Sequence, residues 1–257
     1  LSKKLFNGLF RPIFMERKTS VAVEVCAYSL ESCIAADRAG ADRVELCSSP
    51  HDGGCTPSIG LVKAVMANTK LEVHAMLRSR GGDFCYDDFE KQNLIYDARE
   101  LKLVGVHGLV VGALLPNGDL DVDFLQELRE EVGDLSLTFH RAIDVSREPD
   151  QVLEQLIQLG FSRILTSGMR DKAIDGIDNI ADLVIQADGR IEIMAGSGVN
   201  PQNCRHFLDI GVDAVHTSAK TLRDSAMVYR RPGISMGGLA EVSEFEIPYS
   251  SEALIRE

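Results

Sequence analysis

From position 21 onward, short apolar segments alternate with amphipathic segments, and this order limits the chain to very few folds. Several of the amphipathic stretches begin at a capping residue or an N1 proline and end at a glycine, as helices do. We expect strands over residues 21–26, 43–47, 71–77, 108–112, 136–140, 163–166, 191–195 and 214–217, and helices over 29–39, 57–68, 87–103, 122–131, 148–159, 173–187 and 201–209. Eight βα units in series predict a parallel sheet, and eight is the number that closes a (β/α)8 TIM barrel. A doubly wound open sheet is the alternative.

The two ends of the chain do not follow this pattern. Residues 1–20 are basic and nearly free of acidic side chains, and we interpret them as an N-terminal leader, with a transit peptide as the alternative. Residues 21–225 form the predicted TIM-barrel domain, and residues 226–257 a C-terminal tail that packs on the barrel. Because glycines and prolines interrupt the region after the last strand, the eighth helix is expected to be short, displaced or missing.

The charge balance excludes some kinds of partner. With 27 Lys plus Arg against 39 Asp plus Glu, the net charge is −12, which argues against nucleic-acid binding. No apolar run reaches the length of about 18 residues that a membrane span needs. The six cysteines are scattered without disulfide-scaffold spacing, so we expect reduced thiols and a cytoplasmic location.

Strand parity predicts an unusual barrel interior. Side chains in a strand alternate between its two faces, and the aliphatic set of each strand must face the dry helix layer. The other set then faces the interior, where Val, Ile and Leu are usual. It contains Glu24, Glu45, His74, Arg78, Thr138, His140, Glu192, Met194, His216 and the thiols of Cys26 and Cys47. A buried unpaired charge is costly, so these side chains are expected either to serve a function or to pair with one another. The alternative interpretation is an ion-pair network of Glu24 and Glu45 with Arg43 and Arg78 that only fills space.

The first candidate site is a metal site. Cys26 and Cys47 end neighbouring strands with the same inward parity, and neighbouring strands lie about 4.8 Å apart. Soft thiolates with nearby thioethers select Cu(I), and Met76 and Met194 share the interior. The alternative is a pair of inert buried thiols, which pack as small hydrophobes.

The second candidate site would bind an anion. Arg78 and Arg80 stand on a glycine-rich loop after the third strand, where they suit a carboxylate or a phosphate. Gly196, Ser197 and Gly198 leave the seventh strand, a usual place for phosphate binding in barrels. An Arg–Asp pair that only orders the loop is the alternative for the arginines.

These motifs together resemble the copper homeostasis protein CutC family. The resemblance spans about residues 21–225 and rests on Glu24-Val25-Cys26-Ala27, Ser29-Leu30-Glu31-Ser32, Gly40-Ala41-Asp42-Arg43-Val44-Glu45-Leu46-Cys47, Gly53-Gly54, Thr56-Pro57-Ser58, Arg80-Gly81-Gly82-Asp83-Phe84, Thr138-Phe139-His140-Arg141-Ala142, Ile164-Leu165-Thr166-Ser167-Gly168 and Met194-Ala195-Gly196-Ser197-Gly198. It implies a cytoplasmic barrel associated with copper tolerance, with Cu(I) bound by the cysteines at positions 26 and 47. The chain departs from the family pattern at Ser79, where proline is usual, and at Lys220, where arginine is usual.

Two functions remain open. The first is a cytoplasmic copper homeostasis protein that binds Cu(I) through Cys26 and Cys47. The second is a TIM-barrel enzyme for a small anionic metabolite, with or without a phosphate group, in which Glu24 or Glu45 is the base and His140 or His216 the acid. The resemblance and the irregular eighth unit also predict a homo-oligomer, a dimer or a tetramer.

Overall fold

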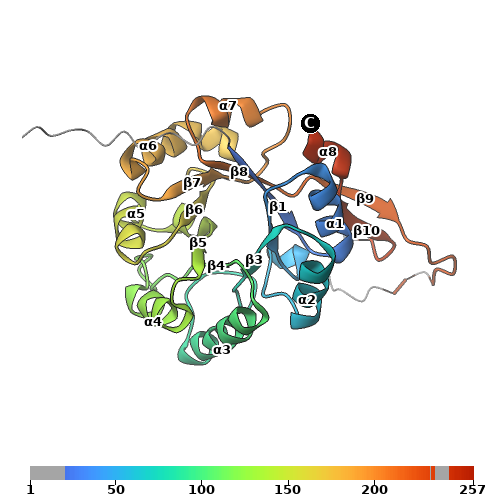
Figure 1. Ribbon diagram of the computed structural model, residues 1–257, viewed down its shortest axis with the longest axis horizontal. Coiled ribbons are helices and arrows are strands. Elements are labelled where there is room, and N and C mark those ends of the chain that lie inside the picture. Colours follow the sequence, from blue (N-terminus) through green and yellow to red (C-terminus); the bar gives the residue numbers. More distant parts are fainter. Residues whose placement is uncertain (1–20, 232, 235–242) are drawn as a thin grey trace, which may run out of the picture.

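A computed structural model describes residues 21–231, 233–234 and 243–257, and the predicted leader, residues 1–20, lies outside the described residues. Eight parallel strands close into a barrel in the order β1 to β8 (Figure 1). The strands are β1 (Ala22–Ala27), β2 (Arg43–Leu46), β3 (Glu72–Met76), β4 (Gly108–Val111), β5 (Ser136–Phe139), β6 (Arg163–Thr166), β7 (Glu192–Ala195) and β8 (Ala214–Thr217). The predicted TIM barrel is therefore confirmed, and the open sheet is excluded because β1 pairs with β8.

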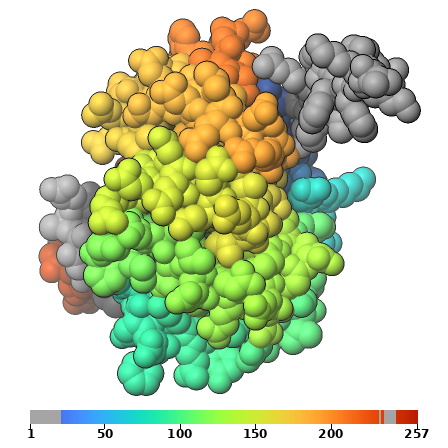
Figure 2. Space-filling model, turned by 90° about the vertical axis from the view of Figure 1, so that its left-hand side faces the viewer, coloured from blue at the N-terminus to red at the C-terminus, as the bar shows by residue number. Residues whose placement is uncertain are grey.

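Helices surround the strand ring. They are α1 (Leu30–Ala39), α2 (Ile59–Asn68), α3 (Asp88–Val104), α4 (Val122–Val132), α5 (Pro149–Gln158), α6 (Ile177–Ala187) and α7 (Cys204–Asp209), with 3-10 turns at Pro50–Asp52, Arg141–Val145 and Ala173–Gly176. Seen from the side, α4 to α6 form a continuous layer coloured green to gold (Figure 2). None of the described helices is both long and apolar enough to cross a membrane.

Two helices are shorter than their sequence patterns predict. The α6 helix starts only at Ile177, because Ala173–Gly176 forms a 3-10 turn before it. The α7 helix starts at Cys204, because the side-chain oxygen of Asn200 accepts the backbone N–H groups of Gln202 and Asn203 and holds a turn there.

Between the last barrel strand and the last helix, the chain forms an additional antiparallel strand pair. After β8, strands β9 (Lys220–Asp224) and β10 (Glu246–Ser250) form an antiparallel pair, and the short helix α8 (Glu252–Arg256) follows. Both β10 and α8 pack on α1, where the backbone N–H of Ser250 donates to the hydroxyl of Ser32 at 3.0 Å. In Figure 1, α8 lies between α7 and α1 in the helix ring. The expectation of a short or displaced eighth helix is confirmed.

The strand register sets the height of each side chain in the barrel. Cys26 lies opposite Glu45, and Glu24 lies opposite both Arg43 and His216. The aliphatic alternates, such as Val25 and Val44, are completely buried in the main core. The two sets face opposite sides of the sheet, as strand parity predicted, and the ionisable groups meet inside the barrel.

Candidate functional site

A cavity of about 410 Å³ opens at the carboxyl ends of the strands. The first strand, β1, and the last, β8, both contribute to it, as do the segments that follow β3, β5 and β7. Among the residues that the sequence singled out, its walls include Cys26, Glu45, Arg78, His140, Ser197, Gly198 and His216. The other four predicted ligand, acid–base and anion-site residues, Glu24, Cys47, Arg80 and Gly196, are not among the residues that line it.

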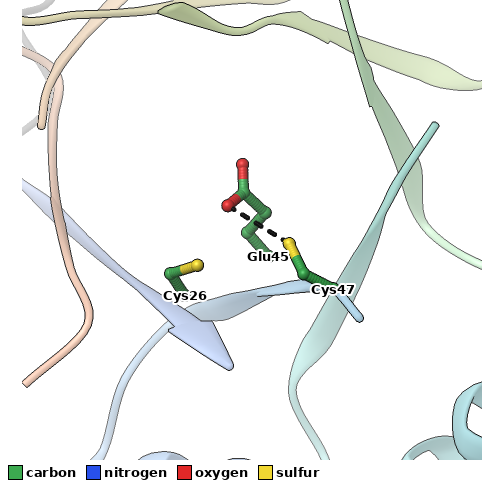
Figure 3. A group of neighbouring side chains, drawn as sticks. All are labelled: Cys26, Glu45 and Cys47. Carbon is green, nitrogen blue, oxygen red and sulfur yellow. Dashed lines mark hydrogen bonds between the residues drawn. The ribbon is translucent and has the colours of Figure 1, made fainter. Parts of the chain in front are cut away.

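Two thiols and one carboxyl group form the first cluster, in which Cys26 and Glu45 line the cavity and Cys47 lies behind them (Figure 3). One ligand atom each of Cys26, Glu45 and Cys47 lies within 4.8 Å of the others, and all three residues are buried. The thiols are offset along the barrel axis, because Cys26 is level with Glu45 and Cys47 follows two residues later. The Sγ of Cys47 donates to Oε2 of Glu45 at 3.6 Å. The structure thus brings together the two cysteines that the sequence proposed as metal ligands, with Glu45 between them.

Apolar and aromatic side chains pack around the two thiols. Cys26, Cys47, Met76 and Val110 pack together, and Tyr28 covers them, with its hydroxyl 3.5 Å from the Sγ of Cys26. Gly54 leaves room for Cys47, since a Cβ at this position would lie 3.1 Å from that sulfur and 3.7 Å from Cε of Met76. Sulfur is therefore the dominant donor type in this corner of the cavity.

A chain of ionisable side chains lies beneath and beside the thiols. The Nε of Arg43 donates to Oε2 of Glu24 at 2.6 Å, and Nδ1 of His216 lies 2.8 Å from the other oxygen of Glu24. The second imidazole nitrogen, Nε2, lies 3.7 Å from Oε2 of Glu45. Glu24, Glu45 and His216 also offer ligand atoms within 4.8 Å of one another. His216 thus lies between two carboxyl groups, and Glu24 fixes its orientation.

The two carboxyl groups differ in their protonation. Burial disfavours the charged form of both, but the hydrogen bond from His216 and the nearby charges of His216 and Arg43 lower the pKa of Glu24 below its usual range. Burial and the negative charges around it, first that of Cys26, raise the pKa of Glu45 well above the usual value. This environment therefore favours the ionised form of Glu24 and the protonated form of Glu45.

The pKa values of the two thiols and of His216 also differ from their usual values. The Cys47 thiol interacts with Cys26 and, together with His216, lowers the pKa of Cys26 well below the usual thiol value, although burial opposes this. The same interaction and burial raise the pKa of Cys47. Burial opposes the charge on His216, but its acidic neighbours outweigh burial and raise the pKa of His216 well above the usual value. The surroundings thus favour the thiolate of Cys26 beside the charged form of His216, the arrangement that makes a cysteine a strong ligand or nucleophile.

The two arginines predicted to bind an anion differ in location and in their bonding partners. Arg78 is 6 % exposed and lines the cavity, and its guanidinium donates to the carbonyl oxygens of Asp52, Gly54 and Gly82. Arg80 forms ion pairs with Glu90 and Asp83 and lies outside the cavity lining. The alternative that an Arg–Asp pair orders this loop therefore describes Arg80 but not Arg78.

The floor of the barrel holds a second polar group. Arg163 pairs with Glu192 at 2.7 Å and donates to Thr138 at 3.0 Å, and one of its nitrogens lies 3.4 Å from Nδ1 of His74. Burial lowers the pKa of His74 to about 4, so this imidazole is neutral. The inward residues at this depth thus bond to one another. Of the ion-pair network that was the alternative interpretation, the structure forms the pair between Arg43 and Glu24, whereas Arg78 bonds to carbonyl oxygens.

Sequence reasoning missed several of the groups that shape the site. Arg163 has the inward parity of its strand, so the same rule that found Glu192 would have found it. Tyr28 follows Cys26 by two residues and therefore lies on the same side of the chain. Arg141 lines the cavity, and its partner Asp144, 2.8 Å away, also accepts bonds from Thr166 and Ser167. No sequence pattern pointed to Asp144, because it lies in a 3-10 turn.

Fold and site together define a class of protein: a (β/α)8 barrel whose mouth holds a buried pair of thiols beside a carboxyl–imidazole–carboxyl chain. The sequence model of the CutC family matches residues 21–221. The chain therefore belongs to the CutC family, as its motifs indicated.

Solved structures agree with this assignment. A protein from Streptococcus agalactiae assigned as the copper homeostasis protein CutC is 34% identical, with a TM-score of 0.74 over 77% of this chain and 99% of that one. The aldolase QR15 is 17% identical, with a TM-score of 0.57 over 79% of this chain and 92% of that one. A thiamine phosphate pyrophosphorylase from Pyrococcus furiosus is 14% identical, with a TM-score of 0.52 over 77% of this chain and 86% of that one. The last two share the fold alone.

Proposed function

We propose that this chain is a copper homeostasis protein that binds Cu(I) through Cys26 and Cys47 at the mouth of the barrel. The observation that supports this most is the buried thiol pair, whose sulfur atoms lie within 4.8 Å of each other and of a carboxyl oxygen. Two metal–sulfur bonds of about 2.3 Å, the length found for zinc thiolates, would span about that distance. The name of the 34% identical relative supports the same function.

The donor chemistry fits Cu(I) better than a hard cation. Two cysteine sulfurs are soft ligands, and the thioether of Met76 packs against the same pair. Cys26 is already poised as a thiolate, so the ion would displace a proton mainly from Cys47. Glu45 lies 3.6 Å from the Cys47 sulfur, and it would act as a third ligand after losing its own proton.

An anaerobic Cu(I) titration against a competing chelator tests this proposal. The wild type is expected to bind one Cu(I) per chain, and the double variant Cys26→Ser/Cys47→Ser is expected to lose this binding. Cys204→Ser is the matched control, because Cys204 is half-buried in α7, away from the cavity lining. Unchanged Cu(I) stoichiometry in the double variant, or tighter binding of Zn²⁺ than of Cu(I) in the wild type, would contradict the proposal.

Two further features belong to this proposal. We place the protein in the cytoplasm, because a Cu(I) site made of cysteines needs reduced thiols. We also expect a homo-oligomer, because Leu222, Val228, Tyr229 and Ile247 of the C-terminal hairpin region are exposed by 52%, 95%, 62% and 39%. Analytical ultracentrifugation of the wild type checks this, and a monomer at all concentrations would contradict it.

A second candidate function is an enzyme that acts on a small anionic metabolite. The observation that favours it is the chain from Glu24 through His216 to Glu45, which pairs an oriented imidazole with a protonated carboxyl group beside a cavity far larger than one ion needs. His216 would act as the acid–base group, and Glu24 would hold its orientation. A thermal-shift screen of anionic metabolites on the wild type tests this function. Failure of every anion to raise the melting temperature would contradict it.

A further inference from the structure

We propose that the cavity contains a recognition site for a small organic oxyanion, a carboxylate or a phosphate ester, built from the ends of β3, β5 and β7. This inference deepens the second candidate function, on which it rests for the presence of a ligand in the cavity. It does not depend on copper, because Cys26 lies in β1 and Cys47 directly follows β2. The groups that carry it are His140, Arg78, Arg141 and the loop after β7.

His140 supplies a donor whose proton position is set by the backbone. Its Nδ1 accepts the backbone N–H of Ala142 at 3.1 Å, so the proton of the neutral ring is on Nε2. Burial, followed by the charge of Arg78, lowers the pKa of His140 to about 3, which keeps the ring neutral. Nε2 is buried and has no hydrogen-bond partner among the described residues. Buried donors without an acceptor are uncommon in folded proteins.

Arg78 offers a second donor on the same wall. Its Nε is also buried and without a partner in the described part of the chain, although its other nitrogens hold three carbonyl groups. The ring of Phe84 connects the two side chains, because it lies 5.0 Å from the Arg78 guanidinium and 4.6 Å from the His140 ring. The Phe84 ring therefore lies beside two side chains that each have an unpaired N–H group, one of which also carries a positive charge.

Arg141 adds a charge that remains accessible. Its Nε pairs with Asp144 and its Nη2 donates to the hydroxyl of Ser167 and the carbonyl oxygen of Arg170, whereas Nη1 has no partner among residues 21–231, 233–234 and 243–257. The side chain is 40% exposed and lines the cavity. The free Nη1 can donate a charge-assisted hydrogen bond to an oxyanion, while the other nitrogens hold the side chain in place.

The loop after β7 faces this wall with backbone donors. Ser197 and Gly198 have φ angles of 81° and 78°, and the hydroxyl of Ser197 donates to the carbonyl of Asp171. Their backbone N–H groups have no acceptor in the described residues, and both residues line the cavity. A left-handed conformation at a serine costs about 1–2 kcal/mol, so the surrounding contacts must hold this loop in shape. The loop therefore presents two free amides beside the cavity.

Size and charge agree with a small organic anion. The cavity of about 410 Å³ falls in the range of small-molecule sites and exceeds what one ion requires. Arg78 and Arg141 bring positive charge to the cavity of a chain whose net charge is −12. A ligand with one anionic group would meet these donors and leave its other end toward His216 and the thiols.

Calorimetry on metal-free, reduced protein tests the site with three probes: inorganic phosphate, glycolate and phosphoglycolate. Ethylene glycol is the neutral control, since it has the carbon skeleton of glycolate without the charge. At least one anionic probe is expected to bind and to raise the melting temperature, and the glycol is not. Glycolate binding without phosphate binding indicates a carboxylate site, and the reverse indicates a phosphate site. Absence of binding by all three anions overturns the inference.

A matched pair of variants assigns the binding to His140. His140→Asn keeps an acceptor for the Ala142 N–H and removes the distal donor, whereas His140→Gln restores a donor near the position of Nε2. We expect the Kd for the bound probe to rise at least about tenfold in His140→Asn and to stay within about threefold in His140→Gln. Equal affinity of His140→Asn and the wild type contradicts the proposed contact.

Two more variants complete the design. Arg80→Met removes an arginine of the same loop that does not line the cavity, and it is expected to bind the probe as the wild type does. If His140→Asn does not fold, Arg141→Met replaces it, with the same expected loss of affinity. Because the protein is free of metal in these experiments, their failure leaves the Cu(I) proposal standing, and failure of the Cu(I) titration leaves this site standing.

Discussion

Replacing Arg43 by methionine tests how strongly the barrel depends on its internal charges. Glu24 and Arg43 are 0% and 4% exposed, and their contact of 2.6 Å is closed to water. Methionine fills a similar volume but leaves the Glu24 carboxylate with His216 as its remaining bonded partner. Loss of one partner of a buried ion pair typically costs about 3–5 kcal/mol, so we expect the free energy of unfolding to fall by about that amount.

Urea unfolding followed by far-ultraviolet circular dichroism measures this effect, since the chain contains no tryptophan for fluorescence. Arg99→Met is the matched control, because Arg99 forms an ion pair of the same kind with Glu131 at 2.7 Å, but with side chains that are 47% and 28% exposed. Such a surface pair is worth about 0–1 kcal/mol. The double variant Arg43→Met/Glu24→Leu should be more stable than Arg43→Met, because no uncompensated carboxylate remains. If Arg43→Met costs no more than Arg99→Met, the argument that the interior charges depend on each other is wrong.

Further predictions concern acid stability and the space beside the thiols. The pKa values of His140 and His74 in the folded chain, about 3 and about 4, lie below the usual 6.5, so the unfolded chain binds more protons between these limits. The urea midpoint should therefore fall as the pH is lowered from about 6.5 to 4, and less steeply in His140→Asn; an equal slope would contradict the assignment of a buried neutral imidazole. Gly54→Ala should weaken Cu(I) binding in the chelator competition, because its new Cβ would lie 3.1 Å from the Cys47 sulfur at a φ of 100°. Gly40→Ala, at a φ of 85° with nothing within 4 Å, should lose about 1–2 kcal/mol of stability and no Cu(I) affinity.

The eight βα units predicted the fold and strand parity predicted the thiol pair, because both follow from local rules. Alternation places Cys26 and Glu24 on the inner face of β1 whatever the rest of the chain does. The height of Cys47 relative to Cys26 could not be predicted, because it depends on the stagger between two strands, which closure of the whole barrel sets.

The roles of individual charged groups could not be predicted for a different reason. Arg78 and Arg80 are nearly adjacent in the sequence, yet one lines the cavity and the other pairs with Glu90 at the start of α3. That pairing depends on a capping box in which Asp87 and Glu90 hold the helix end beside the loop. Such contacts between a loop and a later helix leave no periodic pattern in the sequence.

The contact between His216 and Glu24 spans the seam where the last barrel strand meets the first. Cys26 belongs to the first of these strands, so the imidazole reaches its neighbourhood only after the ring has been completed. An intermediate in which this seam is still open would have the thiols but lack the charge arrangement that activates them. Binding of a metal ion at the thiols would accordingly stabilise the closed barrel over every partly folded form. The free energy of unfolding would then be highest for the metal-bound protein.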